Sequence, residues 1–141
     1  MTTGDVAHTL YGKSRVLPLD EAECRSRLNS RTLGRIAIKL ADDLLIVPVY
    51  YAVMDGDIVF RTAPGTKLSA AVLKTKVAFE VDGAAPGWSV LVRGHVEEIR
   101  DIGEQQRAQS LLGEEWPAGE RDHIVRLRTE RITGRWLLPK S

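Results

Sequence analysis

The residues best suited to chemistry lie in one run, FRTAPGTK, at residues 60–67. An apolar stretch ends in Arg61 and Thr62, a Pro-Gly turn follows, and a helical pattern then begins with Thr66 and Lys67. Free backbone amides at a helix start attract anions, and a lysine there adds a full positive charge. Thr66 can cap the helix and also donate its hydroxyl. The spacing alone predicts either an anion site or an ordinary capped helix with a solvated lysine, and the P-loop pattern is absent.

A second candidate pair stands at the start of a long apolar run, at Trp88 and Ser89. The Ser89 hydroxyl could hydrogen-bond the edge of a ligand, and the Trp88 ring could stack on an aromatic group. The alternative is a core tryptophan beside an exposed serine.

No other residues form a ready catalytic constellation. The histidines stand at positions 8, 95 and 123, which is not metal-ligand spacing, so no metal site is expected. Cys24 lies on a helical face with Leu28 and is interpreted as a core residue. Any reaction is therefore expected to belong to a bound cofactor.

The elements that position these residues are mostly strands, because hydrophobicity alternates with period two over most of the chain. Short helices are expected from Asp20 to Leu28, around Leu68 to Val72 and from Asp101 to Leu112. Strands are expected over 35–40, 44–53, 57–62, 76–82, 88–100, 123–129 and 132–138. Most connections are short turns, so the prediction is a mainly β fold: an antiparallel split β-barrel with a few short helices packed outside. Residues 1–17 are interpreted as a tail or arm and residues 18–141 as one domain.

The stretch Leu44 to Val53 is nearly all apolar and is predicted to be covered on both faces. A monomer covers only one of these faces easily, so a homodimer is expected. Pro48 lacks an amide hydrogen, which predicts that it lies at a sheet edge or a bulge.

Composition excludes several classes of protein. The chain has 141 residues and a formal charge of +1, which gives no electrostatic reason to expect nucleic-acid binding. Its one cysteine excludes an internal disulfide. Its longest apolar stretch, residues 44–54, is shorter than the roughly 20 residues of a membrane-spanning helix. The first 15 residues lack the apolar core of a signal peptide, and a cytoplasmic location is expected.

The order of motifs resembles that of the pyridoxamine 5′-phosphate oxidase-like proteins, small flavoproteins with an FMN-binding split β-barrel. The resemblance covers residues 18–136 and is strongest to a short, actinobacterial-type branch. It rests on GRIA at 34–37, PVYY at 48–51, DG at 55–56, the 60–67 run, VAFEVD at 77–82, GWSV at 87–90, VRG at 92–94 and DH at 122–123. The final RITGRW at 131–136 does not match the C-terminal signature of the vitamin B6 oxidases, so that substrate is not expected.

The resemblance implies a homodimer with two flavin sites at the subunit interface. Matching residues imply that Arg61 and Thr62 line the isoalloxazine and phosphate region, that Thr66 and Lys67 hold the phosphate, and that Ser89 reaches the flavin ring. Trp88 beside Ser89 is added as a cofactor-binding candidate. The leading interpretation is an FMN-dependent oxidoreductase that acts on an unknown small molecule.

Two alternatives remain open. A deazaflavin-dependent reductase would need further basic contacts, for which Lys13, Arg15 and Arg35 are candidates. A non-enzymatic flavin- or haem-binding protein is the other, and a haem would require His95 or His123 to face the pocket as an axial ligand.

Overall fold

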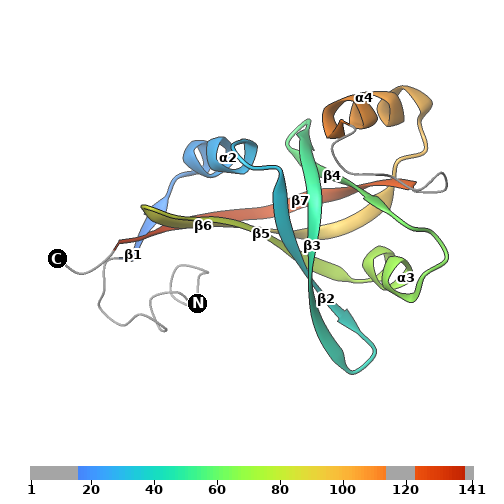
Figure 1. Ribbon diagram of the computed structural model, residues 1–141, viewed down its shortest axis with the longest axis horizontal. Helices are drawn as coiled ribbons and strands as arrows, with labels where there is room; N and C mark the ends of the chain where they lie inside the picture. Colours follow the sequence, from blue (N-terminus) through green and yellow to red (C-terminus); the bar gives the residue numbers. More distant parts are fainter. Residues whose placement is uncertain (1–15, 114–122, 139–141) are drawn as a thin grey trace.

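In the computed structural model, which describes residues 16–113 and 123–138, seven antiparallel strands form a sheet that closes on itself (Figure 1). The order is β1-β7-β4-β3-β2-β5-β6, and a further pairing of β7 with β6 closes a six-stranded barrel. The strands are β1 (Val16–Leu19), β2 (Leu33–Leu40), β3 (Asp43–Met54), β4 (Asp57–Thr62), β5 (Lys76–Ala84), β6 (Gly87–Glu98) and β7 (His123–Leu137).

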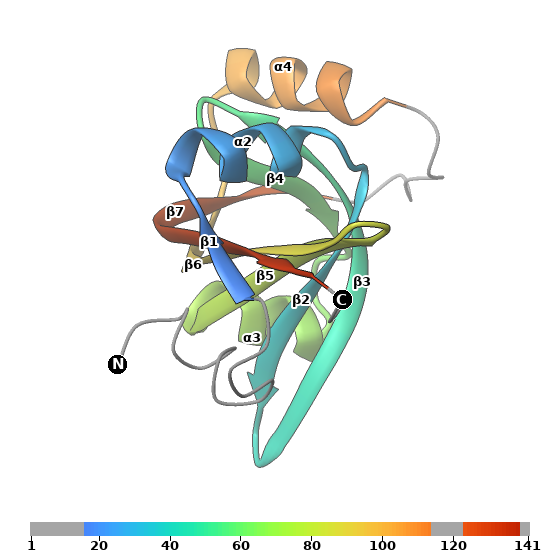
Figure 2. The same ribbon diagram turned by 90° about the vertical axis from the view of Figure 1, so that its left-hand side faces the viewer.

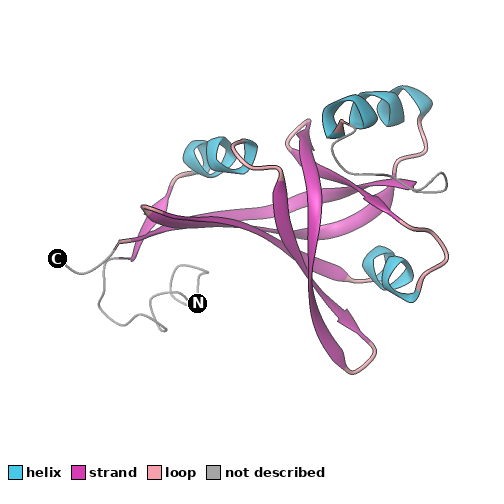
Figure 3. Cartoon of the chain, in the orientation of Figure 1, coloured by secondary structure: helices cyan, strands magenta, loops and turns pink. Residues whose placement is uncertain are grey.

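Three short helices pack outside the barrel: α2 (Glu21–Asn29), α3 (Lys67–Lys74) and α4 (Ile102–Leu112). Each begins at a side chain that accepts a backbone N–H three residues later: Asp20 for α2, Thr66 for α3 and Asp101 for α4. Helices α2 and α4 lie on one side of the barrel and α3 on the other (Figure 2), and the centre consists of strands (Figure 3). The predicted mainly β barrel with external helices is confirmed.

The C-terminal strand differs from the prediction, because the two strands expected over 123–129 and 132–138 are one continuous β7. Its pairing with β6 shifts register where Arg93 faces Arg131 and the next residue, Gly94, faces Thr129, so Glu130 is left without an opposite residue. This extra residue is a β-bulge, which interrupts the alternation without ending the strand.

The N-terminal strand β1 was not predicted either, and its first two residues fall in the stretch interpreted as a tail. Val16 and Leu17 lie opposite Leu137 and Trp136 of β7. Four residues carry too little periodicity to indicate a strand, and here pairing with a distant segment creates it. Residues 1–15 lie outside the described residues.

The barrel opens between β3 and β4. The two strands are paired only from Tyr51, opposite Phe60, to Met54, opposite Asp57. Beyond Phe60, β4 continues along β7 alone, while residues 43–50 of β3 pair with β2 alone. Pro48 therefore lies on a free strand edge, as its missing amide hydrogen predicts.

The free part of β3 and its partner β2 form a hairpin that projects from the barrel (Figure 1). Leu44 and Ile46 are 81% and 72% exposed, so the expectation that this stretch is covered on both faces is wrong for the single chain. One face of the hairpin packs on the core through Val47 and Val49, and the other is bare. In the part of the chain that the structure describes, no helix is long and apolar enough to cross a membrane.

Candidate functional site

A cavity of about 420 Å³ lies where β3 and β4 part, and the start of α3 covers it. Most of its wall is apolar because the inward residues of the hairpin and the helix meet there. The lining residues are Ile36, Ile38, Val47, Pro48, Val49, Phe60, Arg61, Thr62, Ala63, Thr66, Leu68, Ser69 and Val72. Polar groups gather at the rim formed by the end of β4 and the first turn of α3.

Arg61 brings the positive charge to this rim. One of its Nη2 hydrogens is donated to the carbonyl oxygen of Gly113 over 3.0 Å, and the side chain is partly buried. Gly113 ends α4 with a φ of +69°, a conformation that favours glycine. The other four N–H donors of the guanidinium form no hydrogen bond with the described residues.

Thr66 and Ser69 form the polar start of α3. The Thr66 hydroxyl oxygen accepts the Ser69 backbone N–H over 3.0 Å, and its proton is donated to the Ala63 carbonyl over 3.1 Å. Ser69 is 7% exposed and lines the cavity. Sequence reasoning missed Ser69, although Thr66, Ser69 and Val72 recur every third residue on one helical face.

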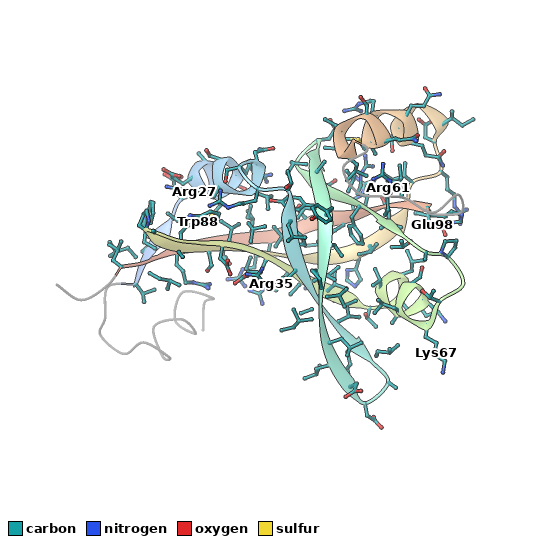
Figure 4. The ribbon with its side chains drawn as sticks, viewed as in Figure 1. Arg27, Arg35, Arg61, Lys67, Trp88 and Glu98 are labelled. Atoms are coloured by element: carbon teal, nitrogen blue, oxygen red, sulfur yellow. The ribbon has the colours of Figure 1, made fainter. Side chains whose placement is uncertain are left out.

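Lys67 is the predicted anion-binding residue that the structure separates from the cavity. It is exposed at the outer end of α3, and its side chain points away from Arg61 (Figure 4). It does not line the cavity, although the flexible side chain starts one residue from Thr66. Its role in phosphate binding stays a prediction.

Trp88 lies at the far end of the barrel from Arg61 (Figure 4), and Ser89 is the next residue of β6. Neither residue lines the cavity. The Trp88 ring is 2% exposed, and the guanidinium carbons of Arg27 and Arg31 lie 5.3 and 5.2 Å from its centre. Ser89 is 5% exposed and accepts a hydrogen bond from Arg135 Nη1 over 3.3 Å. Within one chain, Arg61, Thr62 and Thr66 therefore come together, whereas Trp88 and Ser89 do not join them.

The described residues proposed for the alternative ligands do not line the cavity. His95 contacts the Glu130 carboxylate, His123 Nδ1 lies 3.6 Å from Glu98 Oε1, and neither lines the cavity. Arg35 donates to Asp82 over 2.7 Å on the outer face of the sheet. Lys13 and Arg15 lie outside the described residues, as do Asp122 and His8.

Arg61 is the one charged side chain among the described residues that line the cavity. Those residues offer hydroxyls but no carboxylate, imidazole or thiol, so they cannot supply a strong general base or nucleophile. An apolar slot with a cationic rim is suited to a flat ligand that carries an anionic tail, and the chemistry would then come from that ligand.

The chain is similar to known proteins in sequence and in structure. A solved structure of the FAD-binding protein from Mycobacterium smegmatis is 36% identical, with a TM-score of 0.79 over 87% of this chain and 99% of that one. A FAD-binding protein from Mesorhizobium loti is 27% identical, with a TM-score of 0.75 over 86% and 97% of the two chains. An uncharacterized protein from Mycobacterium tuberculosis is 34% identical over 95% of this chain and 93% of its own length. The family model described as pyridoxamine 5′-phosphate oxidase matches residues 20–136. The chain therefore belongs to the pyridoxamine 5′-phosphate oxidase-like family.

Proposed function

We propose that this chain is a flavin-dependent oxidoreductase that works as a homodimer on a small-molecule substrate. The flavin is bound through its FMN half, either as FMN itself or as the corresponding part of FAD, which the relatives from Mycobacterium smegmatis and Mesorhizobium loti are described as binding.

One observation carries the proposal. The cavity joins an apolar wall, suited to the flat isoalloxazine ring, to a rim where Arg61, Thr66 and the first amides of α3 converge. These are donors that an anionic phosphate attracts. Thr66 would turn its hydroxyl proton from Ala63 to the phosphate, and Ser69 adds a second hydroxyl at the same end.

The bound flavin would supply the transfer of electrons, which none of the side chains that line the cavity could perform alone. The chain's own residues would bind and orient the ring: the apolar wall excludes water from one side, and Arg61 fixes the phosphate end. The absence of acidic or basic groups other than Arg61 among the described lining residues fits this division of roles.

The bare face of the β2–β3 hairpin supports the homodimer. Leu44, Ile46, Leu33 and Tyr50 are exposed there, and they are opposite or alternate residues of one hairpin. Arg35 and Lys39 share this face. A cluster of exposed apolar side chains of this kind marks an interface. A second copy would also be needed to bring Trp88 and Ser89 to a flavin held by Arg61 of the first.

The two alternatives have less support. For a deazaflavin, the described basic candidate Arg35 already pairs with Asp82 and Glu80. For a haem, His95 and His123 face carboxylates rather than the cavity.

The test is to titrate the purified protein with riboflavin, FMN, FAD, a deazaflavin coenzyme and haem, and to follow absorbance and heat. We expect FMN and FAD to bind more tightly than riboflavin, with quenched flavin fluorescence. Anaerobic addition of NADH or NADPH then tests whether the bound flavin is reduced. Binding of haem or deazaflavin but no flavin would overturn the proposal.

A further inference from the structure

A polar groove of about 370 Å³ lies beside the apolar cavity, between β4 and α4. It is lined by Arg61, Gln106, Gln109, Ser110 and Gly113. Arg61 lines both hollows, so one arginine stands between an apolar cavity and a groove of amides and a hydroxyl. Figure 4 shows Arg61 below α4.

The groove residues of α4 share one face of the helix, since positions 106, 109, 110 and 113 follow helical spacing. In the part of the chain that the structure describes, no hydrogen bond engages the side chain of Gln106, Gln109 or Ser110. Gln105, by contrast, donates to the Ile99 carbonyl over 2.8 Å and so attaches the helix to the barrel. One glutamine thus has a structural contact, and two leave their amides available to a ligand.

These groups match the parts of an adenosine phosphate. A glutamine amide can pair with both N6 and N7 of adenine, because it offers one acceptor and two donors in one plane. The Ser110 hydroxyl can bond to ribose. Four N–H donors of the Arg61 guanidinium form no hydrogen bond with the described residues, and a guanidinium can bind phosphate oxygens in pairs.

We infer that this groove is a subsite for an adenosine phosphate group, and that its occupant is the adenosine half of FAD. The inference rests on the proposed function, in which the flavin ring occupies the apolar cavity. A dinucleotide would run from that cavity past Arg61 into the groove, whereas FMN would end at Arg61 and leave Gln106 and Gln109 without a ligand.

The experiment compares the unaltered protein with the double variant Gln106→Ala/Gln109→Ala, by titration with FMN, FAD and ADP. Both glutamines are exposed, so folding is expected to be unchanged, and thermal unfolding checks this. Leu111→Ala, a 53% exposed position of α4 outside the groove, is the matched control. We expect the unaltered protein to bind FAD at least about tenfold more tightly than FMN. In the double variant this difference should disappear, while the affinity for FMN stays the same.

Equal affinities for FMN and FAD, or an equal loss of both in the double variant, would overturn the inference and leave the proposed function standing. Gln-dependent binding of ADP without a preference for FAD would also overturn it, and would assign the groove to a separate adenosine nucleotide. If ADP bound in a Gln-dependent manner but no flavin did, the assignment of FAD to the groove and the proposed function would both be overturned. If neither bound, both would be overturned.

Discussion

The guanidinium of Arg61 donates to the carbonyl oxygen of Gly113 over 3.0 Å, and this bond joins the end of β4 to the end of α4. Gly113 is the C-cap of α4, and its positive φ turns the chain out of the helix. The arginine is thereby held at the boundary between the cavity and the groove.

Arg61→Ala is expected to weaken FMN binding roughly tenfold or more. A hydrogen bond from a charged group contributes about 1.5–3 kcal/mol, and about 1.4 kcal/mol is a factor of ten. Riboflavin lacks the phosphate, so its affinity should change little. Lys74→Ala, which removes an exposed cation from the far end of α3, is the matched control. Calorimetric titration of the unaltered protein and the two variants with FMN and riboflavin measures the affinities. An equal loss of affinity for FMN and riboflavin in Arg61→Ala would indicate a damaged cavity instead.

Lys67→Ala tests the predicted phosphate contact that the structure does not bring to the cavity. If the flexible ammonium turns toward the phosphate in the complex, FMN affinity falls by roughly tenfold and riboflavin affinity does not. The effect should shrink at high salt, since the exposed lysine is screened. Unchanged FMN affinity would assign Lys67 to the solvated face of a capped helix.

Ile46→Asp is expected to convert the dimer into a monomer, because it places a charge in the centre of the bare hairpin face. Ile46 is 72% exposed in the single chain, so the substitution leaves the core intact. Ile102→Asp, at a 70% exposed position on α4, is the control and should remain dimeric. Light scattering during size-exclusion chromatography gives the masses. A monomeric unaltered protein, or a dimeric Ile46→Asp variant, would contradict the proposed interface.

The free energy of unfolding is expected to decrease as the pH rises from about 4.5 to 7, because of Glu80. Burial, a hydrogen bond with Asp82 and the charge of Asp82 raise the pKa of Glu80 to about 7, although Arg35 and Arg135 oppose this. The folded chain therefore holds a proton in this range that the unfolded chain has released, so the free energy of unfolding decreases as the pH rises and levels off above pH 7.

Glu80→Gln should flatten this profile, and urea unfolding at a series of pH values measures it. Glu21→Gln, which alters an exposed glutamate of α2, is the control and should follow the unaltered protein. A profile of the Glu80 variant that still falls over the same range would assign the slope to other groups.

Gly94→Ala is expected to destabilise the fold by about 1–3 kcal/mol, the usual cost of overpacking. A Cβ atom at this position would lie 1.8 Å from the Arg128 carbonyl oxygen, which the β6–β7 ladder holds in place. The same substitution at Gly103, in the first turn of α4, meets only the Asp101 side chain at 3.2 Å. It should be neutral or stabilising by up to about 1 kcal/mol, because alanine favours helices. Equal effects of the two substitutions on urea unfolding would contradict this explanation.

Much of the fold could be predicted because its signals are local. The caps at Asp20, Thr66 and Asp101 and the stop at Gly113 are fixed by residues within one turn of each helix. The continuity of β7 across its bulge and the pairing of β1 depend on segments far away in the chain, so no local pattern revealed them.

The candidate site also has a part that local sequence predicts and a part that only the fold brings together. Arg61, Thr62 and Thr66 are close in sequence and meet at the cavity, whereas Gln106 and Gln109 come from a helix that only the fold brings beside Arg61. Spacing along α4 shows that the glutamines share a face, but it does not show which strand that face meets.

The position of β7 also has a consequence for the order in which the chain can fold during synthesis. This strand pairs with β1, β4 and β6, although it is the last strand of the barrel to be made. Until it emerges from the ribosome, β4 and β6 have open edges and β1 has no partner. Only the meander β2–β3–β4 and the pairing of β5 with β2 and β6 can form earlier. A nascent chain stalled before residue 123 would therefore expose sheet edges that other chains can pair with, and closure of the barrel is a late event in its biosynthesis.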